Sequence, residues 1–170
     1  MYPIYVFNKV NNVPMKYIFI LFFALGFATG CGEDEPEFFI EEDLQDIFNT
    51  FAEEAASRGV VIDYESLNIM AQLRSIGVNA RAGTAGFCRS SENGSREVVV
   101  DRNFWNSAGP LQQELVVYHE LGHCVLGLGH TDDLDDRGNC TSIMHSTVNF
   151  CEESFNSMTR SDYLDELFSQ

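Results

Sequence analysis

The feature that most constrains this chain is the run HELGH, which begins at His119. It lies in a segment with apolar residues at helical spacing that opens at Pro110, and proline is well accommodated in the first turn of a helix. Residues four apart on a helix project from the same face, so His119 and His123 can reach one metal ion, with Glu120 beside them. The segment predicts a central helix, ending near Leu126, that carries a metal site.

The residue types in this run suit zinc chemistry. Neutral imidazoles are good zinc ligands, and two of them leave room for a third ligand and a water molecule. Zinc lowers the pKa of that water towards about 7, and a neighbouring carboxylate can take its proton during attack on a carbonyl group. Glu120 is the predicted general base. The four histidines of the chain fall in one short stretch, which disfavours a purely structural role for the motif.

The longer run HELGHCVLGLGH resembles the motif HExxHxxGxxH of the metzincin clan of zinc endopeptidases, and SIMH resembles the methionine-containing turn of that clan. The resemblance implies that His130 is the third zinc ligand and that Met144 lies beneath the metal. It implies an endopeptidase acting on protein or peptide substrates, with the substrate antiparallel to an edge strand of a small mixed sheet. The segment Glu97–Asp101 is one candidate for the strand beside the cleft.

The chain departs from the clan pattern because Gly127 and His130 each stand one residue later. One extra helical residue rotates the chain exit by about 100°. Gly127 and Gly129 must therefore supply the backbone freedom that returns His130 to the metal. Asp132 and Asp133 are the alternative third ligands.

Two other functions stay open on the sequence. One is a gluzincin-type peptidase, in which Glu152 or Glu153 is the third ligand. The other is a zinc-binding surface lipoprotein without catalysis, although the intact Glu120 favours an enzyme. His145 is expected to be structural or to form a pocket wall. The tyrosine that some metzincins carry after the methionine turn is missing, so the oxyanion donor stays unassigned.

The fold class predicted for this chain is α+β. With 170 residues and 45% hydrophobic residues, it suits a single packed domain, here residues 41–170, and we expect a monomer. The net charge of −16 disfavours nucleic acid as a partner. A short mixed sheet should pack on an N-terminal helix and the active-site helix. The expected elements are a helix that begins at Glu41 and stops at Gly59, strands at 60–62 and 97–101, a strand or a helix at 67–73, a hairpin turn at 90–95, and a C-terminal helix from Thr159 or Ser161.

The N-terminal segment predicts export. Lys16, followed by a short apolar run and small residues, is typical of a secretory signal peptide of residues 1–30, with Met15 as an alternative start. The sequence ATGC, ending at Cys31, resembles a bacterial lipobox. This implies a lipid anchor on Cys31. The residues that follow predict an acidic tether at 31–40, and its first part, GEDE at 32–35, resembles the acidic stretch that directs some lipoproteins to the outer face of the outer membrane, which implies a place at the outer membrane or cell surface. The alternative is a periplasmic or secreted protein.

Four cysteines remain when Cys31 is set aside. An even number in an exported chain predicts two disulfides, for which three connectivities exist. A bond between Cys140 and Cys151 would clip the segment just after the metal motif. It would leave Cys88 with Cys124, and this is the pairing that we favour.

Overall fold

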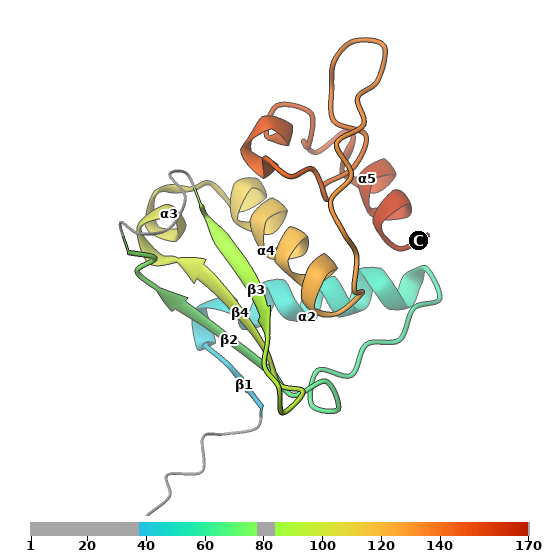
Figure 1. The fold of residues 1–170 in the computed structure, drawn as a ribbon. Helices are drawn as coiled ribbons and strands as arrows, with labels where there is room; N and C mark the ends of the chain where they lie inside the picture. The colour runs from blue at the N-terminus through green and yellow to red at the C-terminus, as the bar shows by residue number, and fades with distance from the viewer. Residues whose placement is uncertain (1–37, 78–83, 170) are drawn as a thin grey trace, which may run out of the picture. The chain divides into compact units, whose positions relative to one another are not determined.

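A computed structural model describes residues 38–77 and 84–169; the predicted signal peptide, Cys31 and most of the predicted tether lie outside these ranges. The described chain forms helices and a four-stranded mixed sheet, which confirms the predicted α+β class (Figure 1). The elements in chain order are β1 (Phe39–Ile40), α2 (Glu42–Ser57), β2 (Ile69–Arg74), β3 (Gly86–Ser90), β4 (Arg96–Asp101), α3 (Arg102–Ser107), α4 (Pro110–Cys124), a 3-10 turn (Val148–Cys151) and α5 (Arg160–Leu167).

The strands lie in the order β1-β2-β4-β3. The first three run parallel, and β3 is antiparallel to β4, with Phe87 opposite Val99. The predicted hairpin is confirmed, and Gly94 in its turn adopts a φ of +88° that favours glycine. The order leaves β3 as the edge strand next to α4 (Figure 1). β1 contains the last two residues of the segment predicted as a tether, here paired with β2.

The core lies between one face of the sheet and the helices. Alternate residues of β2 are buried, as expected for a strand with one face on a core. Their register partners on β4, Val98 and Val100, are fully buried beside them. The helix α2 faces this layer with the apolar residues that predicted it, spaced three and four apart: Leu44, Phe48, Phe51 and Ala55.

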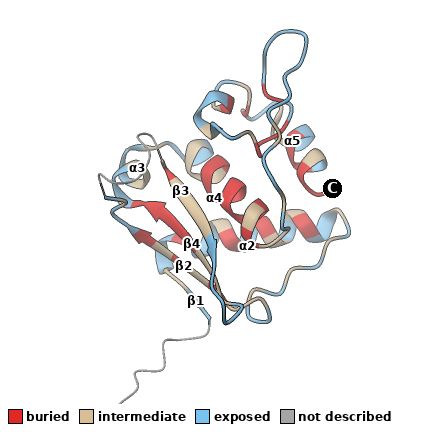
Figure 2. Cartoon of the chain, in the orientation of Figure 1, coloured by how far each residue is buried: buried red, intermediate tan, exposed pale blue. Residues whose placement is uncertain are grey.

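The central helix α4 is the most continuously buried helix (Figure 2). Pro110 opens it, and the Gly109 N–H donates to the Gln112 side chain at 2.9 Å, which satisfies one group ahead of the first turn. The helix ends at Cys124, two residues before the predicted end. The motif histidines therefore stand in its last two turns, where sheet and loops meet.

Two parts of the element prediction were wrong. Residues 60–62 form no strand: Val61 is 90% exposed, while Val60 and Ile62 pack against the core from a connecting segment. A β-branched run needs a partner strand, and this run has none in the described chain. The short helix α3 was not predicted. It begins directly after β4 because the Asp101 side chain caps it.

Two disulfides join Cys88 to Cys124 and Cys140 to Cys151, and they confirm the favoured pairing. The Cα atoms of each pair are 5.5 Å apart. Disulfides of this kind persist in oxidising, non-cytoplasmic compartments. Among the described residues, no helix combines the length and the apolar character that a membrane crossing requires.

Candidate metal centre

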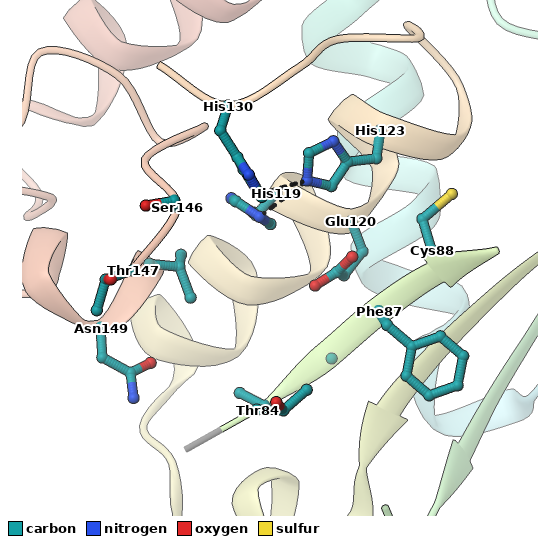
Figure 3. Close-up of a pocket in the computed structure, with 13 residues that line it drawn as sticks. Thr84, Phe87, Cys88, His119, Glu120, His123, His130, Ser146, Thr147 and Asn149 are labelled. Atoms are coloured by element: carbon teal, nitrogen blue, oxygen red, sulfur yellow. Dashed lines mark hydrogen bonds between the residues drawn. The ribbon is translucent and has the colours of Figure 1, made fainter. Parts of the chain in front are cut away.

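Three histidines converge at the C-terminal end of α4. His119 and His123 stand one turn apart on this helix, with their Nε2 atoms 3.1 Å from each other. His130 comes from the following loop and brings its Nε2 to 3.1 Å from that of His123. Figure 3 shows the three rings directed at a common point. One ligand atom from each ring lies within 4.8 Å of the other two, so the group could hold a metal ion.

The hydrogen bonds of two rings fix which nitrogen faces this point. His119 Nδ1 lies 2.7 Å from the Ile143 carbonyl oxygen, and His123 Nδ1 lies 2.7 Å from that of Leu128. A ring nitrogen bonds to a carbonyl only as a donor, so both protons are on Nδ1 and both Nε2 atoms present lone pairs. Lone pairs at this distance repel unless a cation or proton lies between them. Nitrogen ligands at ~2.0–2.1 Å from a tetrahedral zinc ion would be about 3.3 Å apart, close to the separation found.

The two helix imidazoles are held in their neutral, ligand form. His119 is 5% exposed, and its burial lowers its pKa to about 4, with smaller contributions in the same direction from the imidazoles of His123 and His130. The hydrogen bond to the Ile143 carbonyl acts the other way. Burial also lowers the pKa of His123. At neutral pH, protons therefore compete little with a metal ion for these nitrogens.

The one-residue shift of His130 is absorbed in the segment that leaves the helix. Gly127 adopts a φ of +72°, a conformation that favours glycine. The Leu128 N–H donates back to the Gly122 carbonyl at 3.0 Å, which turns the chain towards the site. The Thr131 N–H then donates to the Met144 carbonyl at 2.9 Å. These contacts hold His130 from both sides, so the extra residue does not remove it from the group.

The alternative ligands are engaged elsewhere. The Asp132 carboxylate accepts hydrogen bonds from the Ser146 N–H at 2.7 Å and its hydroxyl at 3.0 Å. The Glu152 carboxylate accepts from the Gln112 side chain at 2.8 Å. Neither these carboxylates nor those of Asp133 and Glu153 belong to a metal-capable group in the described part of the chain. A second such group contains Cys140, His145 and Cys151, but its sulfurs are joined in a disulfide.

Glu120 extends from α4 towards β3 (Figure 3). It is 5% exposed, and burial raises its pKa to about 8, while a hydrogen bond with the Cys88 backbone acts in the opposite direction. A cation held by the histidines would also lower this pKa, because it favours the charged carboxylate. Gly86 makes room for this side chain: a Cβ there would lie 3.0 Å from the Glu120 Cγ. A buried carboxyl whose pKa lies above its ordinary value suits proton transfer.

Met144 packs against the motif helix at Gly122. It is fully buried, and its Sδ would be 2.3 Å from a Cβ on Gly122, so the small residue of HELGH is what lets it pack there. The neighbouring residue Ile143 supplies the carbonyl that orients His119. His145 stacks on Phe150 with ring centroids 5.3 Å apart and does not line the cleft. Ile143 and Met144 thus contact the helix and orient one of the three histidines.

A cleft of about 640 Å³ runs over the histidines and Glu120 (Figure 3). One wall is residues 84–88, at and just before the edge strand β3, and the opposite wall is residues 146–149. The candidate Glu97–Asp101 was therefore wrong as the strand beside the cleft. This strand, β4, is paired on both sides, with β2 and with β3, and has no free edge. Strand order is a tertiary property, and local residue pattern does not report it.

No protein-family profile, curated protein or solved structure matches this chain. The chemistry is therefore argued from the geometry of the site. Sequence reasoning missed Gly86, the wall 146–149 and the tie between Asp132 and Ser146. The glycine carries no local signal of its role, because the carboxylate it accommodates comes from a helix 34 positions later in the chain.

Proposed function

We propose that this protein is a zinc-dependent endopeptidase in which His119, His123 and His130 hold the metal and Glu120 is the general base. One observation carries the proposal. His123 Nε2 lies 3.1 Å from both other Nε2 atoms, while carbonyl groups occupy the Nδ1 positions of the two helix histidines. Such a cluster of lone pairs is suited to a cation. Zinc, when bound there, supplies Lewis-acid chemistry and makes water more acidic.

The residues of the chain account for the remaining steps. The Glu120 carboxylate takes a proton from the attacking water and can pass it to the leaving amine. Its burial excludes competing water, and its contacts with β3 fix its direction. His119 and His123 are held by backbone carbonyls and need little reorganisation to bind the metal. Preorganised groups of this kind are what hydrolysis of an amide requires.

The edge strand supports a peptide substrate. β3 pairs with β4 on one side, and residues 86–88 line the cleft on the other. An extended peptide can add to such an edge through backbone hydrogen bonds, which bring its carbonyl groups past the metal site. The wall 146–149 closes the opposite side, so a bound peptide would lie between β3 and this segment.

The open form of the site favours catalysis over a structural role. Structural zinc sites are commonly closed by four protein ligands, whereas catalytic sites keep a position for water or substrate. Here three histidines form the group, and a buried carboxylate stands beside them in a cleft. A gluzincin-type site has less support, because Glu152 is hydrogen-bonded to Gln112.

Export by a lipoprotein signal belongs to the same proposal. The two disulfides fit an oxidising compartment, which agrees with the signal segment ahead of Cys31. We propose that a lipid on Cys31 anchors the domain at the outer membrane or cell surface. Mass spectrometry of the protein purified from membranes would reveal acyl chains on Cys31; a free N-terminus created by cleavage elsewhere would contradict the anchor.

The test of the activity uses the full-length protein and its Glu120→Gln variant. Both are loaded with zinc, their metal content is measured, and each is incubated with a mixed peptide library. We expect one zinc per chain in both proteins and internal peptide cleavage by the wild type, with a loss of roughly 10²–10⁴-fold in the variant. Equal activity in the two proteins would contradict the role of Glu120, and a metal-free wild type would contradict the site itself.

A further inference from the structure

Cys88 connects three parts of the site. It lies on the edge strand β3 and lines the cleft. Its backbone is hydrogen-bonded to the carboxyl group of Glu120. Its sulfur is bonded to Cys124. Cys88 therefore forms part of the cleft wall, contacts the proposed general base and takes part in a disulfide.

The other end of the cross-link is equally close to the chemistry. Cys124 is the last residue of α4 and follows His123 directly. Its carbonyl accepts a hydrogen bond from the Arg96 guanidinium at 2.7 Å, which ties the end of the helix to the first residue of β4. The disulfide adds a covalent tie from the same helix end to β3. The helix that carries Glu120 is thus fixed to two adjacent strands.

The strand that receives this tie, β3, is an edge strand with a single neighbour, β4. Segments with a low local contact density open at a lower free energy than core strands and helices. If β3 moved away from α4, Glu120 would lose the backbone partner at Cys88 and the close packing against Gly86. The two helix histidines would keep their hydrogen-bond partners. His119 and His123 are oriented by the carbonyls of Ile143 and Leu128, which lie outside β3.

We infer that the Cys88–Cys124 disulfide is a positioning element for Glu120, so that the reduced protein binds the metal but hydrolyses peptides poorly. The inference rests on the proposed function and adds a regulation to it. Oxidation by a disulfide of the exporting compartment removes two protons and two electrons from the Cys88 and Cys124 thiols and gives two thiols of the oxidant. The peptidase therefore becomes fully active only after this exchange, and its reduced precursor is held at low activity.

The first test compares the full-length wild type with the Cys88→Ser/Cys124→Ser variant. We expect equal zinc content, equal far-ultraviolet circular dichroism, a kcat lower by about 10²-fold, and a KM that changes much less. A kcat equal to that of the wild type would overturn the inference. Loss of zinc or of folded structure in the variant would overturn it as well, because the bond would then maintain the whole domain rather than position one side chain.

The second test follows the bond in the Cys140→Ser/Cys151→Ser variant, in which Cys88–Cys124 is the disulfide that remains. A water-soluble phosphine reduces it: the disulfide, phosphine and water give two thiols and the phosphine oxide, and no dithiol reagent is added that could remove zinc. Activity should fall in step with the appearance of two thiols and return on oxidation. Undiminished activity after both thiols appear would overturn the inference. An oxidised wild type without activity would instead contradict the proposed function, and the inference with it.

Discussion

Met144 packs directly beneath Gly122, so closely that a Cβ on the glycine would lie 2.3 Å from the methionine Sδ and 3.0 Å from its Cε. Gly122 stands between the proposed metal ligands His119 and His123 on α4. The packing therefore joins the helix to the methionine turn at the level of the site, and a side chain at position 122 should disturb both.

Gly122→Ala is predicted to destabilise the metal-free protein. Overpacking a filled core costs about 1–3 kcal/mol, and the better helix propensity of alanine offsets at most about 1 kcal/mol of this. Urea unfolding in the presence of a chelator measures the difference. Gly77→Ala is the matched control, since a Cβ at Gly77 meets no atom of the described residues within 4 Å; its free energy of unfolding should change by less than about 0.5 kcal/mol.

Gly86→Ala should separate catalysis from metal binding. The new Cβ would lie 3.0 Å from the Glu120 Cγ and 3.1 Å from the Val99 carbonyl oxygen, and that backbone cannot yield easily. We expect Glu120 to shift, kcat to fall by roughly 10–10²-fold, and zinc content to stay at the wild-type value. Steady-state kinetics and metal analysis on the same preparation check this. An unchanged kcat would mean that catalysis does not depend on the position of Glu120, which would contradict its role as the proton acceptor.

Asp132 is predicted to position His130 without binding the metal. Its carboxylate accepts two hydrogen bonds from Ser146, a residue of the cleft wall, and so links that wall to the loop that carries His130. Asp132→Ala should weaken zinc binding by about 10-fold, as loss of a group that supports a metal ligand does. Asp132→Asn, which keeps an acceptor oxygen, should weaken it less. Calorimetric titration with a competing chelator gives the affinities.

Asp133→Ala is the control for this series. Asp133 contacts Thr141 through its backbone carbonyl, a contact that survives the substitution. Zinc affinity should therefore stay within about twofold of the wild type. A larger loss than in Asp132→Ala would support Asp133 as the third ligand and contradict the assignment of His130.

Asp101 makes the fold sensitive to acid. Its carboxylate accepts hydrogen bonds from the backbone N–H groups of Ile76, Phe104 and Asn103, which together hold its pKa below the usual value. The folded-state pKa is depressed, so this stabilisation is complete above the unfolded pKa of about 3.9 and is lost as the pH falls through the folded value.

The difference in unfolding free energy between wild type and Asp101→Asn should therefore shrink as the pH falls from 6 to below about 4. Asp101→Ala, which also removes the cap of α3, should cost about 1–2 kcal/mol at neutral pH. Denaturant unfolding of the metal-free proteins at several pH values measures both. A difference that stays constant with pH would contradict the role given to the ionised carboxylate.

The residues that were predicted well are those whose signal is local. The spacing of apolar residues predicted α2, the hairpin turn predicted the pairing of β3 with β4, and Pro110 predicted the start of α4. The histidine pair follows from helical geometry alone. His130 also lies in the group despite its shifted position, because the positive φ of Gly127 and the hydrogen bond of the Thr131 N–H return the chain to the site.

What escaped prediction depends on contacts between distant segments. The cleft lies beside β3 and not β4 because of the strand order, which no short sequence window contains. Gly86 and Glu120 are far apart in sequence, and their fit appears only when β3 packs on α4. The run at 60–62 has strand-forming residues, but in the described chain it has no partner strand. Its backbone follows a connecting path on which Val60 and Ile62 pack against the core.

X-ray absorption at the zinc edge tests the central claim most directly. Zinc-loaded wild-type protein should show three imidazole nitrogens and one oxygen at about 2.0–2.1 Å, and His130→Ala should show two imidazoles. A wild-type spectrum with sulfur ligands, with fewer than three imidazoles, or unchanged by His130→Ala would contradict the convergence of the three histidines on one ion.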